Sequence, residues 1–142
     1  GVMQTFMTNS RYASVAKQVD MKRLGKQRVE VKQILNALEG KSKGWVNHPA
    51  VKMWRGYEAN LCIYGMRVCQ EWRNRGYNDS LMPEFMMRFN TYGLVRAPCP
   101  PWVDDPRVHI SHQSNLIRKD PAHYGPLFPG VPDNLPYYWP VP

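Results

Sequence analysis

Large apolar side chains recur every three or four residues through the middle of the chain, and this periodicity constrains the fold more than any other feature. The series consists of Trp54, Tyr57, Leu61, Tyr64 or Gly65, Val68 and Trp72. Side chains at this spacing lie on one face of an α-helix. Pro49 suits a first helical turn and Gly76 suits a helix end. The pattern therefore predicts one helix over residues 49–76, the longest in the chain, with its aromatic face in the core.

Capping residues predict further helices on both sides of this one. Residues 8–10 (Thr-Asn-Ser) can cap a short first helix, and Asp20 can cap a second that Gly40 ends. A short helix is expected over residues 84–89, and a third main helix over residues 106–119.

The C-terminal part of the chain has a different composition. Eleven of the thirteen prolines lie at or after Pro98, and residues 135–140 combine proline with tyrosine and tryptophan. Because disordered segments usually lack aromatic residues, we expect an extended tail packed across the helices. With little sign of strands, the sequence predicts an all-α single domain over residues 1–142, with three main helices and this tail. Residues 97–142 include the third helix and the tail.

The positive charge is concentrated in the first part of the chain. The formal net charge is +8; residues 1–44 carry nine Lys and Arg against three Asp and Glu, and residues 97–142 carry three against four. Such an uneven charge distribution is typical of proteins that bind nucleic acid, although an acidic membrane surface would also attract the positively charged part. No apolar run is long enough to span a bilayer. We expect a cytoplasmic monomer with no membrane association and no obligate protein partner.

The cysteines and histidines give little sign of a metal site. Cys62 and Cys69 are seven residues apart on a predicted helix, which favours buried, reduced core thiols. His109 and His112 share a helix face, but no third ligand is evident. We therefore expect no metal and no cofactor, and prefer phosphate or base hydrogen bonding for the two histidines, or a plain surface role.

A basic run over residues 22–30 is the main functional candidate. Lys22, Arg23, Lys26 and Arg28 surround Glu30 within roughly two helical turns. Cations attract a polyanion, and a carboxyl group among them can transfer a proton or stabilise charge. The alternative is an ordinary solvated helix flank.

Other polar residues allow two interpretations each. His48 is a helix cap or a site residue, and Ser114 and Asn115 are phosphate contacts or exposed polar residues. Arg118 and Lys119 complement a helix dipole or extend a phosphate track.

Residues 24–30, 47–58 and 111–121, whose sequences are LGKQRVE, NHPAVKMWRGYE and SHQSNLIRKDP, resemble the pyrimidine-dimer DNA glycosylase family, which includes phage endonuclease V. The resemblance spans nearly the whole chain and is closest to a bacterial branch of small proteins. It implies an all-α domain that binds duplex DNA, flips a base and cleaves its glycosidic bond, with or without subsequent lyase cleavage of the strand.

The resemblance also implies the chemistry. In this family an N-terminal α-amino group attacks C1′ of the sugar and forms an imine, a glutamate assists, and β-elimination nicks the strand. An α-amine has a reference pKa of about 8 and is therefore partly neutral near neutral pH. Gly1 or Met3 would bear this amine, and a side-chain amine on Lys22 or Lys26 is the alternative.

The family motif places a glutamate directly beside an arginine, whereas Leu24 and Gly25 follow Arg23 here. The matching carboxylate is therefore Glu30 or Glu58, if one is present. The alternative function is a non-catalytic nucleic-acid-binding protein that retains the fold. The nucleic-acid-binding candidates are Lys22, Arg23, Lys26, Arg28, His48, Arg55, His109, His112, Ser114, Asn115, Arg118 and Lys119.

Overall fold

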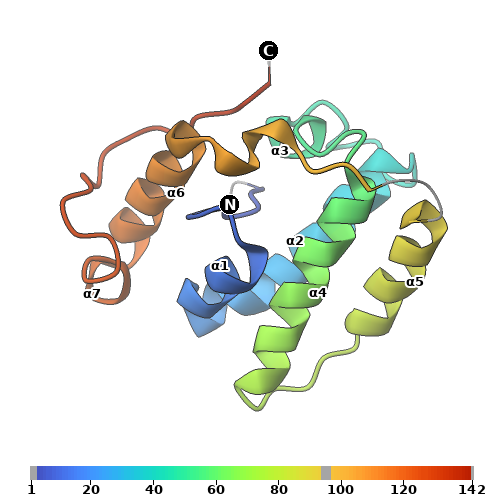
Figure 1. Cartoon of the computed structure of the whole chain (residues 1–142), viewed down its shortest axis with the longest axis horizontal. Coiled ribbons are helices and arrows are strands. Elements are labelled where there is room, and N and C mark those ends of the chain that lie inside the picture. The colour runs from blue at the N-terminus through green and yellow to red at the C-terminus, as the bar shows by residue number, and fades with distance from the viewer. Residues whose placement is uncertain (1–2, 94–96, 142) are drawn as a thin grey trace.

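The computed structural model describes residues 3–93 and 97–141, and within these ranges it contains helices and no strand. The elements are α1 (Tyr12–Gln18), α2 (Met21–Leu38), α3 (Pro49–Lys52), α4 (Glu58–Asn74), α5 (Met82–Gly93), the 3₁₀ helix η1 (Pro101–Asp104), α6 (Pro106–Lys119) and α7 (Pro121–Tyr124), as Figure 1 shows. The predicted all-α fold is confirmed. No helix in the described part of the chain is both long and apolar enough to span a lipid bilayer.

Helix α2 forms as predicted. The Asp20 side chain accepts a hydrogen bond from the Arg23 amide, and Gly40 beyond the last turn adopts a φ of 77°. Leu24, Val31 and Leu35 are fully buried on one face. The preceding helix α1 also exists, but its N-cap is Arg11, without a side-chain cap.

The predicted continuous helix over residues 49–76 is wrong, because the chain breaks between α3 and α4. Gly56 has a φ of 88°, a left-handed conformation that does not continue a helix. The helix restarts at Glu58, whose carboxylate accepts a hydrogen bond from the Gly56 amide at 3.0 Å. With 17 residues, α4 is one residue shorter than α2. The aromatic stripe is nevertheless in the core, since Trp54 and Tyr64 are fully buried.

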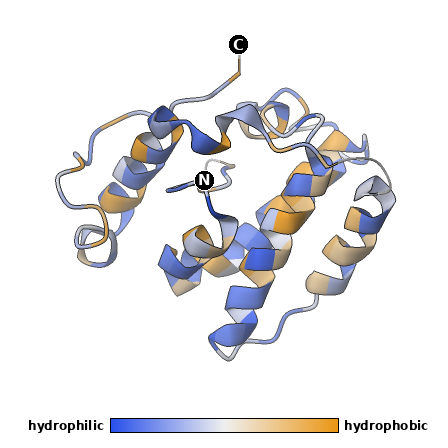
Figure 2. Ribbon diagram, viewed as in Figure 1, coloured by the Kyte–Doolittle hydropathy of each residue, from blue (hydrophilic) through white to orange (hydrophobic). Residues whose placement is uncertain are grey.

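Helix α4 packs against both α2 and α5 (Figure 1). A Cβ atom on Gly65 would lie 2.8 Å from the Phe85 ring and 2.9 Å from a Val31 methyl group, so glycine permits the close approach. Cys62 and Cys69 are buried free thiols in this core, as predicted. Figure 2 shows hydrophobic and hydrophilic residues on different sides of the long helices.

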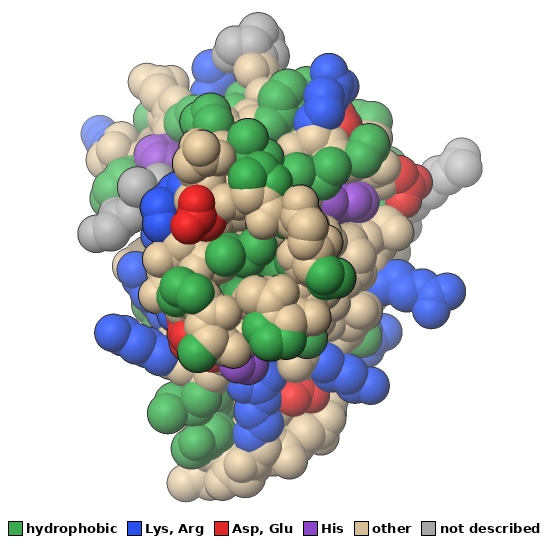
Figure 3. Space-filling view, turned by 90° about the vertical axis from the view of Figure 1, so that its left-hand side faces the viewer, with side chains coloured by type: hydrophobic (Ala, Val, Ile, Leu, Met, Phe, Trp, Pro, Cys, Tyr) green, Lys and Arg blue, Asp and Glu red, His purple; other side chains and the backbone are tan. Residues whose placement is uncertain are grey.

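Helix α6 has the predicted bounds, and the tail packs along it. The Ser114 hydroxyl accepts a hydrogen bond from the Leu135 amide (3.0 Å), and the Ser111 hydroxyl accepts one from the Tyr138 amide (3.1 Å). The predicted packing of the tail is confirmed. The face that carries α6 and the tail has hydrophobic side chains near its centre, with Lys and Arg mostly towards its edges (Figure 3).

Candidate active site

The N-terminal segment, residues 3–8, runs in extended form between α2 and α6 and is held by side chains rather than by a sheet. On the α2 side, the Gln4 amide donates to Glu30 Oε2 (3.1 Å), and the Phe6 amide donates to Gln27 Oε1 (3.1 Å). Gln27 Nε2 donates both to the Gln4 carbonyl oxygen (2.8 Å) and to Glu30 Oε2 (3.0 Å). Gln27 therefore holds both the N-terminal segment and the Glu30 carboxylate in place.

Helix α6 binds the opposite side of the same segment. The Met7 amide donates to His112 Nδ1 at 2.8 Å, and Gln113 Nε2 donates to the Thr8 carbonyl oxygen at 2.8 Å. Buried backbone groups need such partners, because an unpaired one is energetically costly. These contacts fix the spacing between α2 and α6 along the segment.

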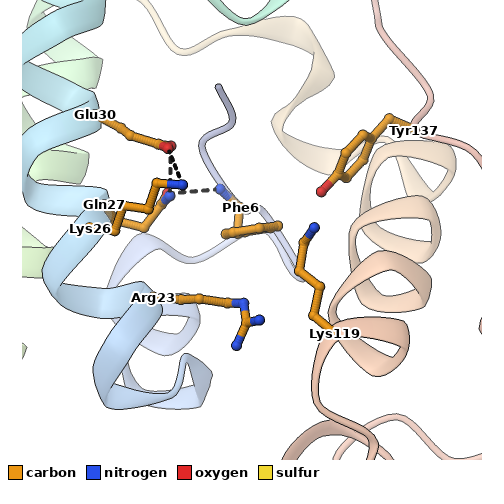
Figure 4. A pocket seen from close by; sticks show the side chains of 7 residues that line it. All are labelled: Phe6, Arg23, Lys26, Gln27, Glu30, Lys119 and Tyr137. Atoms are coloured by element: carbon orange, nitrogen blue, oxygen red, sulfur yellow. Dashed lines mark hydrogen bonds and ion pairs between the residues drawn. The ribbon is translucent and has the colours of Figure 1, made fainter. Parts of the chain in front are cut away.

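A small pocket of about 80 Å³ opens where the segment passes between the two helices. Figure 4 shows the residues that line it, which are Phe6, Arg23, Lys26, Gln27, Glu30, Lys119 and Tyr137. Helix α2 forms one wall, and Lys119 of α6 with Tyr137 of the tail forms the other.

Among the residues that the structure describes, Glu30 is the only acidic one lining this pocket, and its side chain is 7% exposed. Burial raises the pKa of Glu30, against the opposing effects of the Gln4 amide, the Lys26 ammonium group and the Gln27 side chain. Lys26 Nζ lies 3.7 Å from Glu30 Oε1. A carboxyl group with a raised pKa can donate or accept a proton closer to neutral pH than an exposed one.

Three cations border the pocket. Arg23 also forms an ion pair with Asp20 at 3.2 Å, whereas Lys119 has no ion-pair partner in residues 3–93 and 97–141. Burial, followed by repulsion from Arg23, Arg118 and Lys26, lowers the pKa of Lys119. This arrangement favours an anion at the rim of the pocket.

Two other residues of the basic run lie outside the pocket. Lys22 is exposed to solvent on α2. The Arg28 side chain is 13% exposed; its Nε donates to Asp79 at 2.8 Å and its guanidinium group lies 5.1 Å from the centre of the Trp72 ring. The charge of Arg28 is thus paired inside the protein, and its nucleic-acid-binding assignment stays a prediction that these contacts do not favour.

Glu58 and Arg55 do not line the pocket either. The Glu58 carboxylate accepts a hydrogen bond from the Gly56 amide at the start of α4. Arg55 Nη2 donates a hydrogen bond to the Val46 carbonyl oxygen at 3.4 Å. Of the two predicted carboxylates, only Glu30 lies with the cations and the N-terminal segment.

The predicted histidines make structural contacts. His48 caps α3, since its Nδ1 accepts a hydrogen bond from the Ala50 amide at 3.0 Å. Burial lowers the pKa of His48. His109 Nε2 lies 2.7 Å from the Val103 carbonyl oxygen. His112 is fully buried, and burial lowers its pKa to about 3, so it is neutral and out of reach of DNA. The nucleic-acid-binding assignment of His112 stays a prediction that this burial does not favour.

Two predicted phosphate contacts on α6 hold the tail instead. Ser114 is fully buried beneath Leu135, and Asn115 Nδ2 donates to the Leu135 carbonyl oxygen at 3.0 Å. Both phosphate-contact assignments stay predictions that burial by the tail does not favour. Arg118 Nη1 donates to the Asp133 carbonyl oxygen at 2.6 Å, next to the same tail.

The sequence interpretation missed Gln27, Phe6 and Tyr137. Gln27 could have been found, because it lies one helical turn before Glu30 on the same face. No local pattern distinguishes Tyr137 from its aromatic neighbours. Of the two predicted amine carriers, Met3 is buried at the start of the segment and Gly1 lies outside the described residues.

A family model described as pyrimidine dimer DNA glycosylase matches residues 3–84, which is more than half of the 142 residues. Comparisons with curated proteins and with solved structures give no match. The matched region contains the α2 wall of the pocket, whereas Lys119 and Tyr137 lie beyond it.

Proposed function

The chain belongs to the pyrimidine dimer DNA glycosylase family, and on this premise we propose that the pocket around Glu30 is the active site of a glycosylase that removes a damaged or modified base from duplex DNA. The observation that carries the proposal is the buried Glu30 carboxylate, which is held against the N-terminal segment and bordered by Arg23, Lys26 and Lys119.

The cations account for DNA binding in this proposal. Arg23, Lys26 and Lys119 contact the phosphates beside the target nucleotide, and this binding weakens with salt because it releases condensed counterions. A pocket between helices cannot reach a base inside the stack. The target nucleotide therefore rotates out of the duplex, which is easiest where damage has already weakened its pairing.

An amine carries out the covalent step. Its nitrogen bonds to C1′ as the bond from C1′ to the base breaks, and the base leaves with the electron pair and takes up a proton. The nitrogen then loses a proton while the sugar ring oxygen gains one, and ring opening gives the imine. Glu30 exchanges these protons, for which its raised pKa suits it. Loss of a C2′ proton then breaks the bond from C3′ to oxygen, which nicks the strand.

The nucleophile that we propose is an α-amino group at the start of the N-terminal segment, on Gly1 or Met3. The support is the position of the segment, because the Gln4 amide lies 3.1 Å from Glu30 Oε2. Lys22 is a weaker alternative, since it does not line the pocket, and Lys26 is already paired with Glu30.

Borohydride trapping tests this proposal. The protein is mixed with a duplex that carries one abasic site, the imine is reduced, and the modified peptide is mapped by mass spectrometry. We expect a covalent adduct at the N-terminal amine. Tight, salt-sensitive binding without any adduct would overturn the imine mechanism and favour the non-catalytic nucleic-acid-binding protein.

A further inference from the structure

The Tyr137 hydroxyl group faces the pocket, whereas those of several other tyrosines are used inside the protein. Four others donate hydrogen bonds within the protein: Tyr12 to Asn60, Tyr64 to the Phe6 carbonyl oxygen, Tyr92 to Glu39 and Tyr124 to Asp20. The Tyr137 hydroxyl has no such partner among the residues that the structure describes, and Figure 4 shows it pointing into the pocket between α2 and α6.

The position of Tyr137 is fixed from both sides. Before it, Leu135 exchanges two backbone hydrogen bonds with the Ser114 and Asn115 side chains, each 3.0 Å long. After it, the Tyr138 amide donates to the Ser111 hydroxyl at 3.1 Å. Ser111, Ser114 and Asn115 are all buried, so these contacts exclude water and define the register of the tail. The ring is therefore held in place before any ligand arrives.

His112 connects Tyr137 to the N-terminal segment. The Tyr137 and Phe6 rings each meet the buried His112 ring edge-on, with centroids 5.6 Å and 6.1 Å away. Both rings also line the pocket. The pocket thus has two rigid aromatic side chains near its cations, and aromatic rings provide packing surfaces for nucleobases.

We propose that Tyr137 is a specificity-determining residue whose hydroxyl group hydrogen-bonds the base of the nucleotide in the pocket. The inference rests on the proposed function. It assigns base recognition to the wall that lies outside the family-matched region, opposite the wall that carries Glu30. Burial raises the pKa of Tyr137 to about 12, so the phenol is neutral at physiological pH and can donate as well as accept a hydrogen bond.

The test compares two DNA ligands that differ in whether a base is present. Tyr137→Phe removes only the hydroxyl group. We expect kcat/KM for glycosidic-bond cleavage in a duplex with one cyclobutane pyrimidine dimer, measured as alkali-sensitive strand breaks, to fall about five- to tenfold, the effect of losing one hydrogen bond. The affinity for the same duplex with an abasic site should change less than about twofold, because no base is there to contact.

Tyr138→Phe is the matched control, because Tyr138 lies next in the tail but faces Arg107 outside the pocket. It should leave both measurements unchanged, and melting temperatures should show that both variants fold. Equal losses on both ligands, or no loss on either, would overturn the role of Tyr137. If the wild-type protein cleaved no glycosidic bond in the dimer duplex, the proposed function would fail first and this inference with it.

Discussion

Glu30 accepts hydrogen bonds from the Gln4 amide and the Gln27 side chain, whereas Glu58 accepts one from the Gly56 amide, two residues before it. The first set ties together parts of the chain that are 26 residues apart, and the second is a local contact at the start of α4. From the sequence, both carboxylates were equal candidates. Their surroundings differ because the N-terminal segment passes beside Glu30. The path of this segment could not be predicted, because its sequence has no periodic pattern.

At the scale of this one residue, the raised pKa of Glu30 gives a testable pH dependence. The folded protein holds the Glu30 proton more tightly than the unfolded chain, so the contribution of Glu30 to stability is greatest below pH 4.5, the ordinary pKa of the group. That contribution is lost as the pH rises through the raised pKa.

Glu30→Gln removes this titration. We expect the free energy of unfolding of the variant to increase relative to that of the wild type as the pH rises from 4 to 7, because only the wild type loses the Glu30 contribution; urea denaturation at several pH values measures this. A stability difference independent of pH would contradict the raised pKa.

At the scale of elements, the cations of α2 separate into two groups. Arg23 and Lys26 border the pocket, whereas Arg28 is buried against Asp79 and Trp72. The sequence predicted this helix and both of its ends correctly, because Asp20 and Gly40 are local signals. It could not show that Arg28 is paired, since Asp79 is 51 residues away.

Alanine substitutions separate the two groups. Arg23→Ala should lower the slope of log affinity for DNA against log salt by about 1, because one phosphate contact is lost. Arg28→Ala should leave the slope unchanged and destabilise the fold by about 3 kcal/mol, because it leaves the buried Asp79 carboxylate unpaired. Fluorescence anisotropy titrations and thermal melts measure both effects. An equal drop in slope for the two variants would place Arg28 in the interface.

The break between α3 and α4 shows where helical periodicity is insufficient. Trp54 and Tyr57 continue the apolar spacing into α4, yet Gly56 between them takes a left-handed conformation. The periodicity correctly predicted burial of Trp54 and Tyr64, because burial depends on which side chains face the core. It did not predict backbone continuity, which the single glycine interrupts.

At the scale of the whole molecule, the candidate site is assembled from segments far apart in the sequence. The N-terminal segment lies between α2 and α6, and the tail returns along α6 to place Tyr137 at the pocket. The sequence predicted that the tail packs on the helices, from its prolines and aromatics. The register of the tail could not be predicted, because it depends on buried Ser111, Ser114 and Asn115, whose hydroxyl and amide groups resembled phosphate contacts.

The central claim is that Glu30 in this pocket is the catalytic carboxylate, and glycosidic-bond cleavage by two matched variants tests it most directly. Single-turnover cleavage is measured as alkali-sensitive strand breaks in a duplex with one cyclobutane pyrimidine dimer, alongside binding to the same duplex. Glu30→Gln should slow cleavage by at least about 100-fold while binding persists. Glu58→Gln, which alters only a local contact with the Gly56 amide, should cleave at the wild-type rate. A Glu30→Gln variant as fast as the wild type, or an equal loss in both variants, would contradict the claim.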